Sequence, residues 1–151
     1  MVNTSKIDAQ SGFRALDHRA DKAIEAWAPD LKRLFRAAAE GMFSESADPA
    51  VISADQEWAI QVQASTVEDL LQAWLSELLW IAERDEAVLC EFELSAVEQM
   101  ANSWSARGRA RGGPVPPDSP HTGAPVKAVT YHELRVWQDG DLWRAHLVFD
   151  V

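Results

Sequence analysis

The chain has 151 residues, of which 47% are hydrophobic and 25% are charged, a balance typical of one globular domain with its own core. Its formal net charge of -10 argues against a broad basic surface for DNA or RNA and favours a cation or a basic protein as a partner. The lone Cys90 excludes an internal disulfide, and its place in the apolar run "AVLCEFEL" predicts a buried thiol. The N-terminal segment "MVNTSKIDAQ" lacks an apolar signal-peptide core, and no apolar stretch approaches bilayer-spanning length, so we expect no membrane contact and a cytoplasmic protein.

The first half of the chain alternates strand and helix patterns. Residues 13–28 mix alternating apolar positions with charges, which predicts one strand, or two strands separated by a bend at "DHRAD". Residues 30–43 change to helical spacing, with Asp30 placed to cap the first turn. The alternation in "EWAIQVQA" then predicts a return to strand.

The most strongly patterned helix follows this strand. Ser65 and Glu68 have the spacing of a capping box ahead of an apolar helix that continues to about Glu83. Trp74 and Trp80 fall at helical spacing with several leucines, so we expect both in the core.

The second half has the pattern of β structure. "VLCEFEL" alternates, and the stretch from Val97 to about Arg107 predicts a second, more polar strand. The Pro and Gly density of residues 107–125 then predicts a mobile loop. The strands "VKAVTYHELRVW" and "LWRAHLVFDV" flank Asp139 and Gly140, a pair suited to a tight hairpin turn.

These elements predict an α+β protein, with a mostly antiparallel sheet packed with two main helices. We expect one domain over residues 12–151, preceded by a flexible tail over residues 1–11 and interrupted by the loop at 107–125.

Acidic groups gather at the end of the last predicted strand. The run "HLVFDV" places the Asp150 side chain beside the carboxylate of Val151. This pair is either a solvated strand end or part of a site for a hard cation, which needs further oxygen ligands. In an extended segment Asp17 and Asp21 share one face while His18 points away, but that separation alone does not bring both aspartates to one ion.

Four segments in this order resemble the archease family: "LDHRAD", "LLQAWLSELLW", "VKAVTYHEL" and the terminal "VFDV". The resemblance runs from Phe13 to Val151. It implies a small, non-catalytic α+β cofactor protein that serves an RtcB-type RNA ligase in tRNA splicing and RNA repair. Such a protein promotes guanylylation of the ligase's active-site histidine and so restores the ligase for repeated turnover.

The same resemblance implies a divalent cation, typically calcium with magnesium or manganese as alternatives. It maps the cation onto Asp21, Asp150 and the terminal carboxylate of Val151. Oxygen ligands of this kind suit a hard cation.

Three further residues in the family motifs have a functional and a plain interpretation. Asp17 supports the cation ligands or caps a turn. His18 orients an acidic ligand or is held by backbone hydrogen bonds. Lys127 contacts a phosphate or an acidic patch of the ligase, or it guards an exposed strand edge.

The chain departs from the family pattern at two places. Arg19 and Lys22 add positive charge to the first motif, where they weaken or screen a nearby cation site. In the predicted loop, Arg107, Arg109 and Arg111 alternate with small residues and offer a contact to RNA. Because the overall charge is negative, we expect any RNA contact to be indirect or weak, and none with DNA.

Two other functions remain open from the sequence. The first is a general chaperone or modulator of RNA-modifying enzymes, which binds its partners through exposed apolar surface. The second is a metal-dependent hydrolase, in which clustered carboxylates activate a metal-bound water. We rank the hydrolase low, because the chain contains no recognisable nucleophile motif and no glycine-rich nucleotide loop.

Overall fold

The computed structural model of the chain describes residues 10–16, 22–44, 52–114 and 126–151. Within these ranges the elements are β1 (Gly12–Leu16), β2 (Lys22–Ala28), α1 (Leu31–Phe43), β3 (Gln56–Ala64), α2 (Val67–Arg84), β4 (Val88–Gln99), β5 (Trp104–Gly113), β6 (Ala128–Val129), β7 (Arg135–Asp139) and β8 (Leu142–Asp150). All strand pairs among the described residues are antiparallel. The predicted α+β class with two main helices is therefore confirmed.

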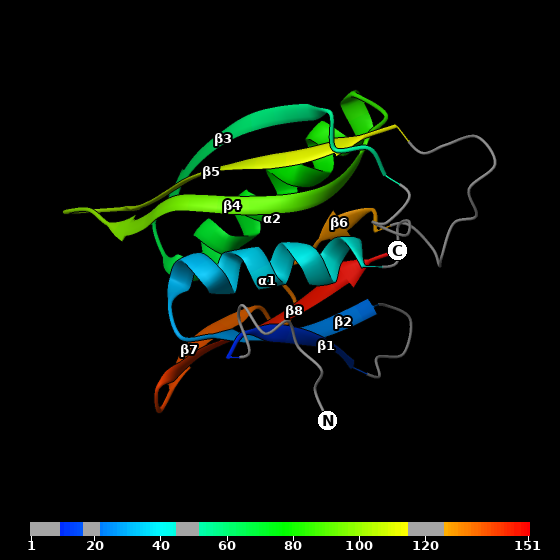
Figure 1. The fold of residues 1–151 in the computed structure, drawn as a ribbon. Coiled ribbons are helices and arrows are strands. Elements are labelled where there is room, and N and C mark those ends of the chain that lie inside the picture. The colour runs from blue at the N-terminus through cyan, green and yellow to red at the C-terminus, as the bar shows by residue number, and fades with distance from the viewer. Residues whose placement is uncertain (1–9, 17–21, 45–51, 115–125) are drawn as a thin grey trace.

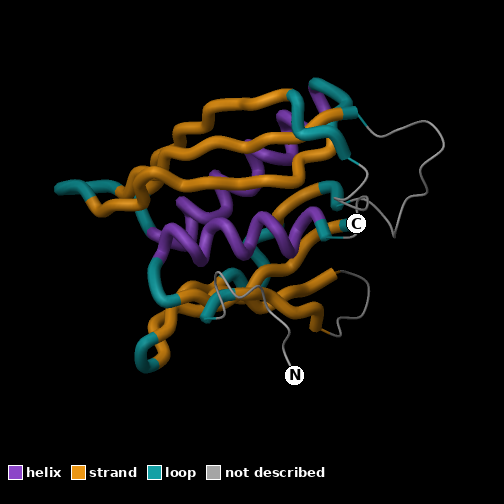
Figure 2. Tube along the Cα trace, in the orientation of Figure 1, coloured by secondary structure: helices purple, strands orange, loops and turns teal. Residues whose placement is uncertain are grey.

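The two helices form a layer between two sheets (Figure 1). The first sheet has the order β1, β2, β8, β6, with β7 also paired to β8, and the second has the order β3, β5, β4. Helix α1 contacts β1, β2 and β8 on one side and β4 on the other, whereas α2 contacts mainly β3, β5 and β6. The secondary-structure colours in Figure 2 show the same arrangement, with helices enclosed by strands above and below. The core is this enclosed layer.

Both helices begin at a capping side chain. Asp30 caps α1 as predicted, because its Oδ1 accepts a hydrogen bond from the Arg33 backbone N–H at 2.8 Å. The cap of α2 is Thr66, whose hydroxyl accepts from the Asp69 N–H at 3.1 Å. The prediction of Ser65 as the cap was wrong by one residue, since Thr66 has the extended backbone that a cap needs.

The two tryptophans of α2 have different environments. Trp74 is fully buried and its Nε1–H donates to the Phe35 carbonyl at 3.2 Å, which ties the two helices together. Trp80 is 52% exposed, so the prediction that it lies in the core was wrong. Its helical position faces outward together with the polar Ser76 and Glu83. None of the helices in the described ranges has the length and apolar character needed to cross a bilayer.

The second sheet overturns the predicted loop boundary. Val97, where the second polar strand was predicted to begin, belongs to β4, which runs to Gln99. β5 covers residues 107–113, so the prediction of a loop over these seven residues was wrong. Of the rest of that loop, Pro114 has no regular secondary structure, and residues 115–125 lie outside the described ranges. β5 has no hydrophobic signal because the residues that face the helices are small: Ala106, Gly108, Ala110 and Gly112.

Gly108 shows why small residues are needed in β5. A Cβ atom added there would lie less than 3.0 Å from the backbone oxygen of Glu93 on β4, at a point where the β4–β5 register shifts. Such a close approach of two strands at a bulge is open to glycine alone. The glycines that suggested a loop are therefore required by the sheet.

The end of the chain forms two short strands and one long one. The predicted strand over residues 126–137 is interrupted between β6 and β7, where Glu133 has a positive φ of 54°. β7 and β8 form the predicted hairpin, but its two-residue loop is Gly140 and Asp141, because Asp139 pairs with Leu142. Gly140 has a φ of 62°, which glycine adopts without strain.

Two further predictions concern single residues. Ser11 is 7% exposed, so the predicted flexible tail over residues 1–11 does not extend to it, and residues 1–9 lie outside the described ranges. Cys90 is only partly buried, at the β4 bulge between Leu89 and Glu91. Desolvation by this partial burial raises the pKa of the Cys90 thiol, and the neighbouring Glu91 adds to the effect, which disfavours the reactive thiolate.

Candidate functional site

Three segments meet where β8 ends. Lys22, the first residue of β2, pairs with Phe149 of β8, and Ala128 of β6 pairs with Asp150. The Lys127 backbone N–H donates to the Asp150 carbonyl at 2.7 Å. Asp150 is exposed, so its carboxylate remains accessible while its backbone is held by β6. We call this region, defined by Lys22, Lys127, Asp150 and Val151, the acidic strand end.

The predicted cation ligands are only partly described. Asp150 and Val151 lie together at the acidic strand end, whereas Asp17, His18 and Asp21 lie outside the described residues. Asp21 nevertheless directly precedes Lys22, and the residue opposite Lys22 directly precedes Asp150. The antiparallel register thus pairs Lys22 with Phe149, the described neighbours of the two halves of the predicted ligand set.

The described residues fit a cation in their chemistry but do not complete a site. No cluster of three or more His, Cys, Asp or Glu side chains suited to a metal occurs within the described ranges. The Asp150 carboxylate supplies hard oxygen atoms of the kind that calcium and magnesium prefer. A further oxygen ligand must come from elsewhere, as the predicted role of Asp21 requires.

Of the two added positive charges in the first family motif, Arg19 and Lys22, only Lys22 is described. It is half-buried at the start of β2, next to the acidic strand end. Arg19 lies outside the described ranges. Lys127 is exposed and immediately precedes the edge strand β6, a position that suits either of its two interpretations.

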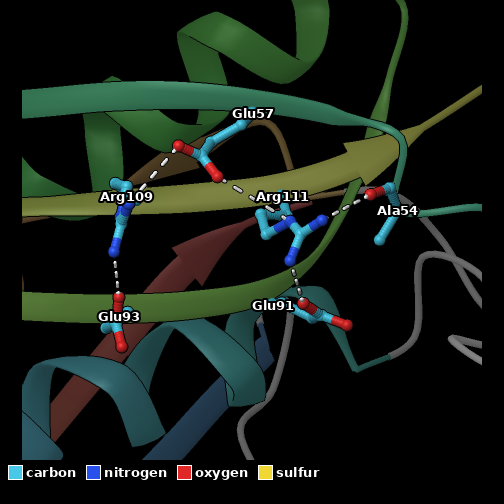
Figure 3. A network of polar contacts seen from close by, with 6 residues as sticks. All are labelled: Ala54, Glu57, Glu91, Glu93, Arg109 and Arg111. Carbon is cyan, nitrogen blue, oxygen red and sulfur yellow. Dashed lines mark hydrogen bonds and ion pairs between the residues drawn. The ribbon is translucent and has the colours of Figure 1, made fainter.

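A network of arginines and glutamates covers the outer face of the second sheet (Figure 3). Arg109 on β5 lies between Glu93 of β4, at 2.7 Å, and Glu57 of β3, at 3.6 Å. Arg111 lies 3.8 Å from both Glu57 and Glu91. The hydrogen bond to Glu93, with the charge of Glu57, raises the pKa of Arg109 further above its already high value.

This network alters the role predicted for the arginines. Arg109 and Arg111 point to acidic partners on the neighbouring strands, so their charges are largely neutralised before any RNA approaches. Arg107, the first of the three arginines along β5, is exposed and forms no ion pair with the described residues. It is a single unpaired charge and not a basic patch. The stretch is therefore part of a self-neutralised sheet surface and not a solvated basic loop.

A second network holds the exposed Trp80. The Arg84 guanidinium lies 4.5 Å from the centre of the Trp80 ring, a cation–π contact. Arg84 also donates two hydrogen bonds to Asp85, at 2.8 and 2.9 Å, and Trp58 Nε1–H donates to the same carboxylate at 2.7 Å. The bonds from Arg84 and then Trp58 lower the pKa of Asp85, and Asp85 in turn raises the pKa of Arg84. Trp58 of β3 thus helps to hold Asp85 and Arg84 at the end of α2, and through Arg84 the ring of Trp80.

A groove of about 440 Å³ runs between α2 and the segment that begins β6. Its α2 side includes Leu79, Trp80 and Glu83, and its other side includes Val126 and Lys127. Sequence reasoning missed this groove, although one signal pointed to it. Trp80 shares its helix face with Ser76 and Glu83, and polar neighbours three and four residues away mark a solvent-facing stripe.

The fold and the acidic strand end define a small α+β protein with a helical layer between two antiparallel sheets and a candidate cation-binding strand end. The profile of the archease protein family (MTH1598/TM1083) matches residues 13–151. The chain belongs to the archease family.

Individual relatives agree with this assignment. The chain is similar to protein archease of Methanosarcina acetivorans, with 32% identity over 92% of this chain and 95% of that protein. Protein archease of Methanosarcina barkeri is 33% identical over the same shares of the two chains.

Two solved structures share the fold. The solution structure of Methanobacterium thermoautotrophicum protein 1598 has a TM-score of 0.79 and 26% identity, covering 93% of this chain and 99% of that chain. A crystal structure from Thermotoga maritima, described as an archease and possible chaperone, has a TM-score of 0.57 and 20% identity, covering 91% and 96% of the two chains. This second likeness concerns the fold alone.

Proposed function

We propose that the protein is a non-catalytic activator of an RtcB-type RNA ligase, which it serves by promoting guanylylation and multiple turnover. The observation that carries the proposal is the register of β2 and β8. It pairs the residue that follows Asp21 with the residue that precedes Asp150, within a chain of the archease family. The described neighbours of two predicted ligands, Lys22 and Phe149, are thereby paired although they lie far apart in the sequence, which supports the proposal.

A divalent cation is part of this proposal. Asp21, Asp150 and the carboxylate of Val151 hold it, with Asp17 and His18 in supporting roles, and calcium is the expected ion. When bound, the cation supplies positive charge that neutralises neighbouring carboxylates and attracts further oxygen ligands. The chain's own part is to hold Asp150 in position, which the hydrogen bond from the Lys127 N–H to the Asp150 carbonyl supports.

The partner in this proposal is the ligase and not the RNA. The net charge of -10 and the pairing of Arg109 with Glu93 leave little positive surface for an RNA backbone. We therefore infer that RNA is contacted weakly or only through the ligase. We place both proteins in the cytoplasm.

The test counts ligase turnovers. The purified protein is mixed with its cognate RtcB-type ligase, GTP and excess RNA with a 3′-phosphate end, using wild type, Asp150→Ala and Asp141→Ala. Asp141 is an exposed acid in the turn at the opposite end of β8, so it is the matched control. We expect many turnovers with wild type and Asp141→Ala, and roughly one with Asp150→Ala, as when a restoring step is lost. Equal turnover with all three proteins contradicts the proposal.

A general chaperone is the second candidate function. Trp80, Met100 and Tyr131 are large apolar or aromatic residues that are 52%, 50% and 64% exposed, and such surface favours binding of other chains. If this is the main function, the protein suppresses aggregation of unrelated clients equally well with and without a chelator. The hydrolase alternative predicts phosphoester turnover by the protein in the absence of any ligase.

A further inference from the structure

Trp80 on α2 is an exposed aromatic side chain held in one place. The residue is 52% exposed, and its ring lies against Arg84, which is hydrogen-bonded to Asp85; Asp85 also accepts a hydrogen bond from Trp58 of β3. A side chain that is already fixed loses little conformational freedom on binding, and tryptophan is the residue type most enriched at the energetic centres of protein interfaces. This exposed ring has the properties of an anchor for another protein.

The groove beside Trp80 gives that anchor a place for a partner's side chain. Leu79 and Val126 contribute apolar surface, while Glu83 and Lys127 carry opposite charges on its two sides. A hollow of about 440 Å³ accommodates one or two side chains of a partner, not a whole helix. The arrangement is an apolar centre with a polar rim, as in non-obligate protein interfaces.

The charges of the groove differ from those of the outer sheet face. Arg109 and Arg111 are already paired with glutamates on the neighbouring strands. Glu83 and Lys127 form no ion pair with any described residue, although both are exposed. Charges left without partners at the edge of a groove are available to a second molecule and help to orient it.

The groove is continuous with the acidic strand end. Lys127 belongs to both regions, because its backbone N–H donates to the Asp150 carbonyl at 2.7 Å and its residue lines the groove. Glu83 and Asp150 carry two negative charges against the one positive charge of Lys127, while the Nζ atom of Lys22 is buried, so this combined surface is acidic on balance. A protein docked over both regions must therefore present basic groups around an apolar side chain.

We propose that the groove between α2 and β6, with Trp80 as its anchor, is the surface on which the RNA ligase docks when the acidic strand end faces it. This inference rests on the proposed function, since it takes the ligase as the partner. The groove supplies affinity and orientation, and the acidic strand end supplies activation. The two roles are carried by different residues and can be separated by mutation.

The test measures binding and turnover side by side with full-length proteins. Isothermal titration of the cognate ligase is done with wild type, Trp80→Ala, Glu83→Lys and the control Met100→Ala. Met100 is 50% exposed, like Trp80, but lies at the turn between β4 and β5 and outside the groove. We expect at least tenfold weaker binding for Trp80→Ala and weaker binding for Glu83→Lys, with calcium and with chelator, and no change for Met100→Ala. A saturating amount of Trp80→Ala restores turnover, because its acidic strand end is intact.

The outcomes separate this inference from the proposed function. If Trp80→Ala and Glu83→Lys both bind within twofold of wild type, or if wild type forms no complex, the docking surface is overturned. If Trp80→Ala abolishes self-association measured by light scattering and leaves ligase binding unchanged, the occupant is a second copy and the inference is also overturned. If binding depends on Trp80 while wild type adds no turnover, the docking surface stands and the activator function falls. Should Trp80→Ala fail to fold by circular dichroism, Glu83→Lys carries the test, since Glu83 is exposed and forms no ion pair with the described residues.

Discussion

Replacing Gly108 by alanine tests whether β5 is a central strand or a loop. Gly108 pairs with Ile60 of β3 and Leu94 of β4, so both of its sides are occupied by neighbouring strands. If the residue lay in a mobile loop, Gly108→Ala would stabilise the protein by about 0.4–1 kcal/mol, because alanine restricts the unfolded chain. In the strand we expect the opposite sign.

The expected loss follows from what the new methyl group meets. Its nearest atom is the backbone oxygen of Glu93, at less than 3.0 Å, followed by Leu94 Cδ1 at 3.1 Å and Leu94 Cα at 3.2 Å. Two of these three atoms belong to the backbone of β4, so a side-chain rotation cannot relieve the contact and the strands must separate. Overpacking of this kind costs about 1–3 kcal/mol. For a chain of this length each kcal/mol lowers Tm by roughly 2–4 °C.

Urea denaturation followed by circular dichroism measures this change, with Gly12→Ala as the control. The three atoms nearest to a Cβ at Gly12 all belong to the Trp27 side chain, at 3.0 Å and beyond, and that half-buried ring can shift. We expect Gly12→Ala to change the free energy of unfolding by less than about 1 kcal/mol. A Gly108→Ala protein as stable as wild type, or more stable, refutes the strand argument.

Three further predictions concern charged side chains. Hydrogen bonds from Arg84 and Trp58 lower the pKa of Asp85, so its contribution to stability is present above the ordinary value of 3.8 and is lost as the pH falls below it. Acid denaturation should therefore show the difference between wild type and Asp85→Asn shrinking below that pH, and a constant difference contradicts the assignment. Calcium at about one hundred times its Kd should stabilise wild type by about 2.7 kcal/mol, measured as a higher Tm, and should not stabilise Asp150→Asn. Equal shifts in the Tm of the two proteins would exclude Asp150 as a ligand. A double-mutant cycle of Arg109→Met and Glu93→Gln should give a small favourable coupling that decreases in molar salt, and a salt-independent coupling argues against an exposed ion pair.

The sequence predicts those elements whose hydrophobic period is clear. The helices over Leu31–Phe43 and Val67–Arg84 have strong apolar stripes, and both were expected within one or two residues of their bounds. β5 could not be found in this way, because its inward residues are alanine and glycine and its outward residues are arginine. Its strand character comes from two neighbouring strands, and a local pattern does not contain that information.

Some residues of the candidate site can likewise be predicted from the sequence, and others cannot. Asp150 and Val151 could be named from the acidic end of a predicted strand and from family resemblance, and the structure places both at the end of β8. The sequence predicts a core position for Trp80, because helical spacing alone does not say which of several apolar residues on a wide face lies at its margin. Only the packing of α2 against both sheets decides that Trp74 is enclosed and Trp80 is not.

The arginine–glutamate network also bears on the register in which three strands pair. Arg109 reaches Glu57 on one side and Glu93 on the other, although β3 and β4 have no hydrogen bonds to each other. A slip of β3 by two residues would keep its apolar side chains facing inward, so burial alone does not forbid it. The same slip would bring Ala59 or Asp55 to the place of Glu57 opposite Arg111. Moving Ala59 there would leave an arginine with one acid fewer, whereas Asp55 would be a shorter acid in its place. Charge placement on the solvent side thus disfavours the slip that brings Ala59 opposite Arg111, which burial of the apolar side chains does not.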